Sequence, residues 1–466
     1  MPKQSSNQPE KLPQKIGLCG FFGYGNLGNA AIQRAVIANI RKRIPDAQIF
    51  GFSLNPEDTQ QRHQIPSFSI VRRPNPAAQC GNNGRPKPSD QTTTAASAAS
   101  HSQAPPQQNG IKAWLKSKPA LFNALKSLKK PLDFLRMLWD EFVYCRKCYK
   151  ILKQLDTFIL SGGGALDEGW GGPWKTPYIT FRWAVLARLA GLNFLVLSVG
   201  VETLESPLSR FFARRALHLA SYRSFRDAYS QAFVRKTCGC EGLLVPDLAF
   251  SLEVDPSIEP PRENHNGRPR SSALVVGISP MDYLDPRSWP RKNARLYQEY
   301  IQTMAAFSEW LLSRGYSVRF FPSDIHMDRL AILDVMETLR NNGRNYSGDQ
   351  IAEERVAIVP ELVADIAAVD FAVASRFHGV VLSHRMRTPV LALSYDPKVN
   401  RLMGDMDLTD YCFTIEHMKL DEMIRAFELL EKNQAKVEEH VKQITTVYRT
   451  SLQNQYDQIF GPGAQS

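Results

Sequence analysis

Cationic side chains follow two strand-like segments in the second half of the chain. Arg376 and His378 come directly after "DFAVAS", and Lys398 comes shortly after "PVLALSY". A helix-like segment separates the two runs, a pattern that predicts adjacent parallel strands. Open parallel sheets bind ligands beyond the carboxyl ends of their strands. We therefore expect His378 and Lys398 to converge at one edge of a cleft and to bind an anion, although each residue alone is more typical of a helix cap or a solvated surface.

The first half of the chain offers matching groups. Arg226 and Asp247 each follow a strand-like segment, in "SFRD" and "VPD". Two glycine-rich loops, "GYGNLG" and "LSGGG", also follow strands, and backbone N–H groups at the start of a helix favour anions. A tight turn would explain the same glycines. The loop positions that we single out are Gly25, Asn26, Gly28, Gly162, Gly163 and Gly164.

Length and composition limit the class of protein. The chain has 466 residues, 43% hydrophobic and 22% charged, with a net charge of +11. These values are typical of a two-domain globular protein, and the charge favours anionic partners without identifying them. The polar N-terminus resembles no signal peptide, and no apolar run approaches the roughly 20 residues of a transmembrane helix. We expect a cytoplasmic protein.

The seven cysteines do not indicate a disulfide framework, because their number is odd and their spacing is scattered. Cys145 and Cys148 form one close pair, and Cys238 and Cys240 form another, an arrangement that would suit zinc. The first pair lies in a helical pattern without the turn residues of a zinc knuckle. We expect reduced structural cysteines, no metal and no cofactor.

Strands and helices alternate along both halves, which predicts an α/β fold of two doubly wound, Rossmann-like domains that face each other across a cleft. Polar and proline-rich stretches mark the expected boundaries. The expected order is a disordered tail at 1–14, an N-terminal Rossmann-like domain at 15–254 with a disordered insertion at 74–110, a linker at 255–272, a C-terminal Rossmann-like domain at 273–412 that carries the strand-end cations, and a helical tail at 413–466 that braces the first domain.

The segment 111–153 holds most of the basic excess, with eleven basic and three acidic side chains. Leucine, phenylalanine and tryptophan recur in it at roughly helical spacing. One interpretation is an amphipathic helix on an anionic membrane surface, and the other is a surface helix with a solvated basic face. We slightly favour the membrane, although Pro119 and Pro131 are expected to break the helix.

Four signatures, in order, resemble the polysaccharide pyruvyl transferase family. They are "GYGNLG", "LSGGG", "SFRD" with "VPDLAF", and "SRFHG" followed by "YDPK", and they span about residues 15 to 400. Each is weak alone, but the ordered set is specific. The resemblance implies a fold similar to the GT-B glycosyltransferases. It also implies transfer of pyruvate from phosphoenolpyruvate to a sugar of a polysaccharide or its lipid-linked precursor, as a cyclic ketal with release of phosphate.

In that family the arginine of "RD", the histidine of "R-x-H" and the lysine of "DPK" are linked to the donor, which implies Arg226, His378 and Lys398 here. Arg376, Phe377 and the glycines of "SGGG" complete the expected donor-binding set. Arginines can bind the donor carboxylate and phosphate by paired hydrogen bonds, and a lysine can act as a point charge. Histidine exchanges protons near neutral pH, so His378 is the candidate general acid or base, or else only a phosphate ligand.

The chain departs from the family at one place. The family loop usually continues with two acids after its last glycine, whereas Asn29 and Ala30 follow here. If those acids act on the acceptor, this protein uses a different acceptor or turns over slowly. The candidates on the acceptor side are Gly25, Asn26, Gly28, Asp167, Glu168, Asp247, Asp324, Trp170 and Trp174, and the tryptophans either stack on a sugar or pack within their loop.

Two other functions fit the same fold. One is a nucleotide-sugar glycosyltransferase, although clustered Arg, His and Lys suit a small, highly charged donor better. The other is a non-catalytic scaffold for polysaccharide assembly, which the missing acids and the basic segment suggest. Nucleic acid binding is disfavoured, because the basic excess is local and no recognition motif accompanies it.

Overall fold

The computed structural model describes residues 14–72, 119–169, 171–258, 273–289, 291–343 and 346–461, without the side chains of 119–132 and 134. The chain divides into two compact units, one made of 1–74 and 152–466 and the other of 75–151. Trp170, almost all of the expected N-terminal tail, the insertion and most of the expected linker lie outside the described residues.

The first parallel sheet of the larger unit has seven strands in the order β3-β2-β1-β4-β5-β6-β7. Its central strands are apolar on both faces, as expected for strands that helices cover on both sides. The strand order reverses between β1 and β4, where ligands of such sheets bind. The bounds are β1 Lys15–Cys19, β2 Gln48–Ser53, β3 Ser67–Ser69, β4 Thr157–Ser161, β5 Asn193–Val199, β6 Tyr222–Phe225 and β7 Leu243–Leu244.

The second parallel sheet has six strands in the order β10-β9-β8-β11-β12-β13. Ala372 of β11 lies opposite Val390 of β12 in parallel register, which confirms the predicted pairing of these two strands. Two parallel sheets in one chain confirm the predicted α/β fold class. The bounds are β8 Val275–Ser279, β9 Ser317–Phe320, β10 Ile351–Glu353, β11 Phe371–Ala374, β12 Val390–Ser394 and β13 Cys412–Thr414.

Side-chain caps begin several of the helices that connect these strands. Asn26, Ser206, Asp227 and Asp396 each accept a hydrogen bond from a backbone N–H of the first helical turn. Around the first sheet the helices are α1 Leu27–Arg43, α2 Pro56–His63, α5 Thr176–Leu189, α6 Pro207–Leu219, α7 Ala228–Cys238 and the short η2 Leu248–Ser251. Around the second they are α8 Ala294–Ser313, α9 Asp328–Asn341, α10 Val359–Ala368, α11 Phe377–Arg385, α12 Pro397–Asp405 and α13 Leu420–Lys432.

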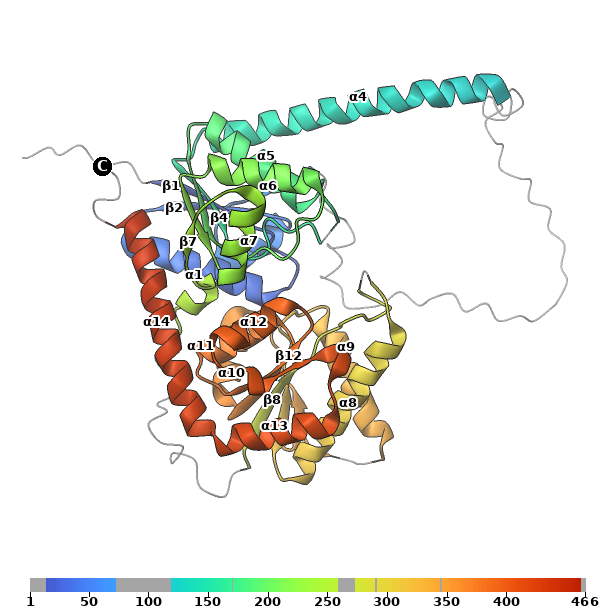
Figure 1. The fold of residues 1–466 in the computed structure, drawn as a ribbon, viewed down its shortest axis with the longest axis vertical. Coiled ribbons are helices and arrows are strands. Elements are labelled where there is room, and N and C mark those ends of the chain that lie inside the picture. Colours follow the sequence, from blue (N-terminus) through green and yellow to red (C-terminus); the bar gives the residue numbers. More distant parts are fainter. Residues whose placement is uncertain are drawn as a thin grey trace, which may run out of the picture. The chain divides into compact units, whose positions relative to one another are not determined.

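The last helix, α14 Gln434–Phe460, returns from the second sheet to the first (Figure 1). Arg43 of α1 donates from Nε to Asp457 at 2.7 Å and from Nη2 to Gln453 Oε1 at 2.8 Å. Ser224 of β6 donates to Gln455 Oε1 at 2.5 Å. The predicted bracing of the first half by the C-terminal helix is therefore confirmed.

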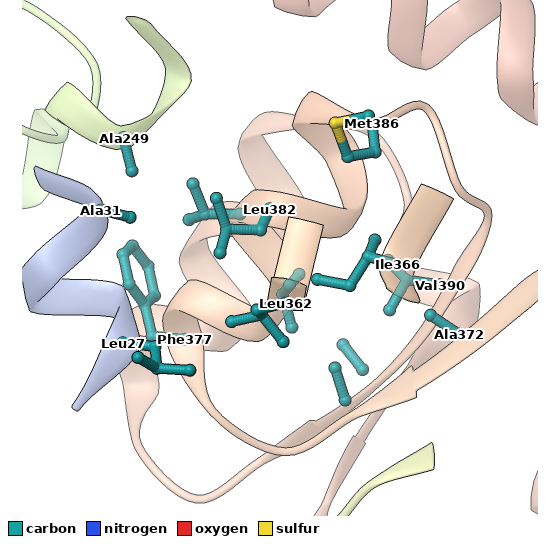
Figure 2. Packing of buried hydrophobic residues seen from close by; sticks show 14 of the residues in the cluster. Leu27, Ala31, Ala249, Leu362, Ile366, Ala372, Phe377, Leu382, Met386 and Val390 are labelled. Atoms are coloured by element: carbon teal, nitrogen blue, oxygen red, sulfur yellow. The ribbon is translucent and has the colours of Figure 1, made fainter. Parts of the chain in front are cut away.

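Apolar packing also joins the two halves of the larger unit. Figure 2 shows the ring of Phe377 on α11 directed toward Ala31 of α1, with Leu27 of α1 near the base of the side chain and Ala249 of η2 nearby. All four residues are buried, and Phe377 is 5% exposed. Burying a phenylalanine side chain contributes about 1.5–3 kcal/mol to stability. This contact therefore holds the start of α11 against the first half.

The smaller unit contains the helix α4 Pro119–Leu152. The predicted interruption at Pro131 is wrong, since the helix continues through it. A proline removes one backbone hydrogen bond and strains the preceding turn, which the remaining turns of a long helix can outweigh. Within the described residues, no helix is long and apolar enough to cross a membrane.

Candidate active site

Loops and helix starts beyond the strands of both sheets supply the charged groups of one site. Arg226 directly follows β6, and Asp247 lies between β7 and η2. His378 lies in the first turn of α11 after β11, and Lys398 lies in the first turn of α12 after β12. The structure brings the two halves together here, because the Arg226 Cζ atom lies 4.4 Å from the centroid of the Phe377 ring.

Arg226 is buried among carboxylates, with its side chain 6% exposed. Its Nε donates to Asp227 Oδ2 at 3.2 Å, while Nη2 lies 3.6 Å from Glu202 Oε1 and Nη1 lies 3.9 Å from Asp247 Oδ2. Burial would lower the pKa of Arg226, but these three carboxylates raise it. Within the described residues neither Nη atom forms a hydrogen bond, so both can donate to an anionic ligand.

A carboxylate–imidazole pair connects the two halves. His378 Nε2 lies 3.7 Å from Asp247 Oδ2, and neither atom has a hydrogen-bond partner among the residues that the structure describes. The other oxygen of Asp247 accepts from the backbone N–H of Ala249 at 3.0 Å. Burial would raise the pKa of Asp247, but the imidazole, the Arg226 guanidinium and this N–H lower it. Asp247 is therefore ionised and can stabilise a proton on the imidazole.

The start of α1 lies directly against this imidazole. A Cβ atom on Gly28 would lie 2.2 Å from His378 Cβ and 2.4 Å from its Cγ and Nδ1. Atoms that close to the backbone cannot move aside cheaply. Glycine is therefore required at position 28 for α1 and α11 to approach, which explains part of the "GYGNLG" signature.

We expect Gly28→Ala to destabilise the protein by about 1–3 kcal/mol, because the added methyl overfills a packed contact. It should also lower turnover, since relief of the overlap moves His378 away from Asp247. Denaturant unfolding and a phosphate-release assay would measure the two effects. Gly348→Ala is the matched control, because nothing lies within 4 Å of a Cβ at that position. Wild-type stability and turnover in Gly28→Ala would contradict the packing argument.

Lys398 enters the site from the second half. Its Nζ lies 3.3 Å from Asp396 Oδ2 and 5.0 Å from the centroid of the Tyr395 ring. Burial would lower the pKa of Lys398, but Tyr395 and Asp396 raise it, so the ammonium group is charged. Asp396 also accepts from the backbone N–H of Lys398 at 3.1 Å, and Pro397 occupies the first helical position. The "DPK" motif thus begins α12, and its aspartate holds the ammonium group of its lysine in position.

A pocket of about 280 Å³ joins these groups. Arg226, Asp247, Phe377 and Lys398 line it, and His378 adjoins these residues, with its Nε2 atom 3.7 Å from Asp247 Oδ2. Two cations on one small pocket suit a compact anion. The other lining residues are Asp227, Ala228, Leu244, Pro246, Phe250, Leu402, Asp405 and Tyr448.

Sequence reasoning missed two residues of the cluster. Glu202 Oε2 forms an ion pair with Arg401, and Glu202 Oε1 faces Arg226. Arg401 lies one turn after Lys398 on α12, and its Cζ is 4.1 Å from the centroid of the Tyr229 ring. Glu202 follows the buried strand β5, and a charge directly beyond a buried strand was the signal that would have identified it.

Asp167 supports the loop that carries Glu202. Its Oδ1 accepts from the backbone N–H groups of Glu202 at 3.0 Å and Thr203 at 2.7 Å. Burial raises the pKa of Asp167, against the effect of these N–H groups and of Lys398. Asp167 lies outside the lining of the pocket, so the structure gives it a positioning role.

Glu168 and Trp174 contact a different part of the first half. The carboxylate of Glu168 accepts from the backbone N–H and hydroxyl of Ser206 at 3.2 Å, at the start of α6. Trp174 is 64% exposed, and its ring packs on those of Tyr178 and Phe212 at 5.4 and 5.6 Å between centroids. Neither lines the pocket, so a role of either in acceptor binding stays a prediction.

The "GYGNLG" loop binds the second half of the larger unit. The backbone N–H of Ile325 donates to the carbonyl of Gly25 at 3.1 Å, and that of Leu27 donates to Ser323 at 2.9 Å. A Cβ on Gly25, where φ is +80°, would lie 2.6 Å from the His326 ring. The positive φ and the close approach both favour glycine. The loop therefore joins the two halves, and its role as an anion cradle stays a prediction.

Asn26 and Asp324 lie at the same contact and are bridged through their backbones. The Asn26 side chain accepts from the N–H of Asn29 at 3.0 Å and begins α1. The Asp324 side chain accepts from the N–H groups of His326 and Met327 at 3.1 Å. Both side chains stabilise the segments that meet here, and neither lines the pocket.

The "SGGG" loop is hydrogen-bonded to Gly200, which makes room for Arg226. Gly162 and Gly163 have φ values of +57° and +63°. The carbonyl of Gly163 accepts from the N–H of Gly200 at 2.9 Å, and a Cβ on Gly200 would lie 2.4 Å from Arg226 Nη2. Gly164 lies beside Asp167, and a Cβ atom added at Gly164 would lie 3.1 Å from Asp167 Oδ2. These glycines do not line the pocket and shape the turn behind it.

Arg376 is not among the residues that line the pocket. Its Nε donates to Asp328 at 2.7 Å and its Nη2 donates to Asp282 at 2.9 Å, and the two aspartate side chains are 0% and 3% exposed. Its guanidinium is thus committed to buried carboxylates. The expected donor-binding role of Arg376 finds no support in its contacts.

We expect Arg376→Met to cost about 3–5 kcal/mol of stability, because removal of one partner leaves buried carboxylates unpaired. Phosphoenolpyruvate affinity of the folded protein should stay within about twofold of wild type. Urea unfolding and calorimetric titration would measure these quantities. Adding Asp328→Asn should restore part of the lost stability. A stable variant with weakened donor binding would instead support the role that the sequence predicted.

Among the described residues, no group of three or more His, Cys, Asp or Glu side chains is arranged to hold a metal ion. Cys238 and Cys240 are buried thiols, and burial raises the pKa of each. Both are therefore protonated near neutral pH and suit a structural role.

The model of the polysaccharide pyruvyl transferase family matches residues 26–397. The chain belongs to the polysaccharide pyruvyl transferase family. The match includes Arg226, Asp247 and His378 and ends one residue before Lys398. It confirms the resemblance that the four signatures indicate. A comparison with curated proteins finds no significant sequence match.

Solved structures share the fold of this pyruvyl transferase family member at low identity. A putative UDP-N-acetylglucosamine 2-epimerase from Listeria monocytogenes is 10% identical over 96% of each chain, with a TM-score of 0.54. UDP-GlcNAc 2-epimerase from Methanocaldococcus jannaschii is 10% identical over 89% of this chain and 92% of that chain, with a TM-score of 0.50. Together with the two parallel sheets, they confirm the predicted GT-B-like arrangement of two α/β halves. E. coli ADP-heptose heptosyltransferase II aligns over 90% of this chain and 98% of that chain at 11% identity, with a TM-score of 0.40.

Proposed function

We propose that this protein transfers pyruvate from phosphoenolpyruvate to a sugar of a polysaccharide or its lipid-linked precursor, forming a cyclic ketal and releasing phosphate. One observation carries the proposal: Arg226, Asp247 and Lys398 line a single small pocket, and the imidazole of His378 faces Asp247 at 3.7 Å. Family membership supports pyruvyl transfer in polysaccharide synthesis. The residues of the pocket support phosphoenolpyruvate as the donor.

Phosphoenolpyruvate carries its carboxylate and its phosphate on the same carbon atom, so two cations close together in a small pocket suit it. In this proposal the Nη atoms of Arg226 bind one anionic group by charge-assisted hydrogen bonds, and the Lys398 ammonium binds the other. Asp227 and Asp396 hold these cations in place through contacts at 3.2 and 3.3 Å. The neighbouring Glu202 and Asp247 keep Arg226 oriented when the donor is absent.

The proposed reaction balances with two sugar hydroxyls. A proton is added to the methylene carbon of phosphoenolpyruvate, and the first hydroxyl attacks the adjacent carbon and loses its proton. The bond from that carbon to the phosphate oxygen then breaks, the second hydroxyl attacks, and its proton leaves with the phosphate. In this proposal His378, which adjoins the lining residues Asp247 and Phe377, supplies the first proton from its protonated form and takes up the proton of the first hydroxyl, and the Asp247 carboxylate stabilises the positive charge.

Calorimetric titration of the purified protein with phosphoenolpyruvate tests the donor directly. We expect saturable binding with a Kd on the order of 1 µM–1 mM, the range common for enzyme substrates. Inorganic phosphate should compete weakly, because it lacks the carboxylate that the second cation binds. UDP-N-acetylglucosamine should not compete.

Other outcomes of that titration would redirect the assignment. Binding of the nucleotide sugar without binding of phosphoenolpyruvate would favour a glycosyltransferase on this fold. Binding of neither donor, by a protein that unfolds cooperatively, would favour the non-catalytic scaffold. Incubation with phosphoenolpyruvate and candidate glycans, followed by mass spectrometry, would then show whether a pyruvyl ketal forms.

A further inference from the structure

One face of α4 exposes large apolar side chains. Leu135, Leu138, Trp139 and Phe142 are 60%, 47%, 64% and 57% exposed. Their spacing of three, four and seven residues places all four on one side of a helix. The rings of Trp139 and Phe142 lie 5.8 Å apart between centroids, so they form one continuous patch. Exposed apolar patches of this kind mark an interaction surface.

Basic side chains accompany this apolar face. Arg136 lies between its first two residues, and Arg146 continues the same stripe four residues after Phe142, followed by Lys147. Residues 111–153 carry eleven basic and three acidic side chains. A helix with Trp, Phe and Leu on one face and Arg and Lys around it is typical of elements that lie on anionic lipid surfaces. Long basic side chains can extend toward headgroups while the apolar face enters the lipid.

Charge disfavours a second copy of the chain as the occupant. In a parallel pair of α4 helices, Arg146 of each copy would face the other copy on the same stripe, and like charges there repel. Trp139 and Phe142 are also bulkier than the branched aliphatic residues that such helix seams prefer. Aromatic side chains are instead enriched at membrane–water interfaces.

We propose that α4 binds the surface of an anionic membrane through Leu135, Leu138, Trp139 and Phe142. The binding itself is independent of the reaction. Its consequence rests on the proposed function: the sugar acceptor is carried on a lipid, and the enzyme meets it at the membrane surface.

Co-sedimentation of the full chain with lipid vesicles tests this proposal. We expect binding to phosphatidylglycerol-rich vesicles and at least about tenfold weaker binding to phosphatidylcholine vesicles. The triple variant Leu138→Ser/Trp139→Ser/Phe142→Ser should lose at least about tenfold in the partition coefficient. Arg136→Glu/Arg146→Glu should lose binding to the anionic vesicles selectively. The control is Leu333→Ser/Val447→Ser, since these apolar residues are 41% and 66% exposed on α9 and α14.

Three results would overturn the proposal. They are failure of the wild type to bind either vesicle, equal binding by the triple variant, and equal loss in the control variant. Light scattering can give a fourth such result. If the wild type does not bind vesicles but forms a dimer, and the triple variant is a monomer, the apolar face binds a second copy of the chain. The same samples are also titrated with phosphoenolpyruvate. A sample that binds phosphoenolpyruvate but not vesicles contradicts the membrane proposal alone, and a sample that binds vesicles but not phosphoenolpyruvate contradicts the proposed function alone.

Discussion

Asparagine in place of His378 is expected to lower kcat for ketal formation by about 10²–10⁴-fold, the usual contribution of a general acid or base. An amide fills similar space beside Gly28 and still forms hydrogen bonds, but it cannot carry a proton. Donor affinity should change little, because Arg226 and Lys398 supply the charge that holds phosphoenolpyruvate. Phosphate release with a pyruvylated glycan as product would measure kcat, and calorimetry would measure affinity.

This experiment separates the two roles that remain open for His378. If the imidazole only binds phosphate, His378→Asn should weaken donor affinity and leave kcat of the saturated enzyme nearly unchanged. Asp247→Asn gives a second test, because the carboxylate acts through the imidazole at 3.7 Å. We expect a smaller loss of kcat in that variant and a shift in the pH dependence of turnover. Equal pH profiles for wild type and Asp247→Asn would remove Asp247 from the mechanism.

Methionine in place of Lys398 is expected to weaken phosphoenolpyruvate binding by about 10- to 150-fold, since a hydrogen bond to a charged group contributes about 1.5–3 kcal/mol. Methionine preserves most of the length of the side chain, and Lys398 is only 19% exposed, so the fold should tolerate the change. The loss should shrink at high salt, because screening weakens the charge interaction in the wild type. Calorimetric titration at two salt concentrations would measure both effects.

Lys419→Met is the matched control for this prediction. Lys419 is 75% exposed, and its ammonium pairs with Glu422 on the surface. Removal of this charge should leave donor affinity within about twofold of wild type. Unchanged affinity in Lys398→Met would show that the lysine of "DPK" begins α12 but does not bind the donor.

Local pattern was sufficient to predict the strands that carry the site. The runs before Arg376 and Lys398 are apolar and are separated by one short helix, and such a unit has few topologies, so β11 and β12 had to be parallel neighbours. The ordered signatures were likewise sufficient to identify the family. These features depend on residues close together in sequence.

Long-range packing decided which charges face the pocket. Arg376 has the same local setting as His378, yet it binds Asp282 and Asp328, which lie 94 and 48 residues away in sequence. Glu202 and Arg401 pair across 199 residues, so the position of Glu202 beyond β5 was a local signal but its partner was not. No local pattern specifies such partners, because the partner depends on how the two sheets are docked.

Local sequence patterns predict the two α/β halves, the strand ends that carry Arg226, His378 and Lys398, and the family. The pairing of Asp247 with His378, the contacts of Arg376 with Asp282 and Asp328, and the contact of the first glycine loop with the second half depend on how the whole chain folds. The difference lies in the separation along the sequence of the residues that interact. Strand and helix formation follow from burial patterns and dihedral preferences over a few residues, whereas the direction of a charged side chain depends on desolvation and partners that folding brings from far along the chain.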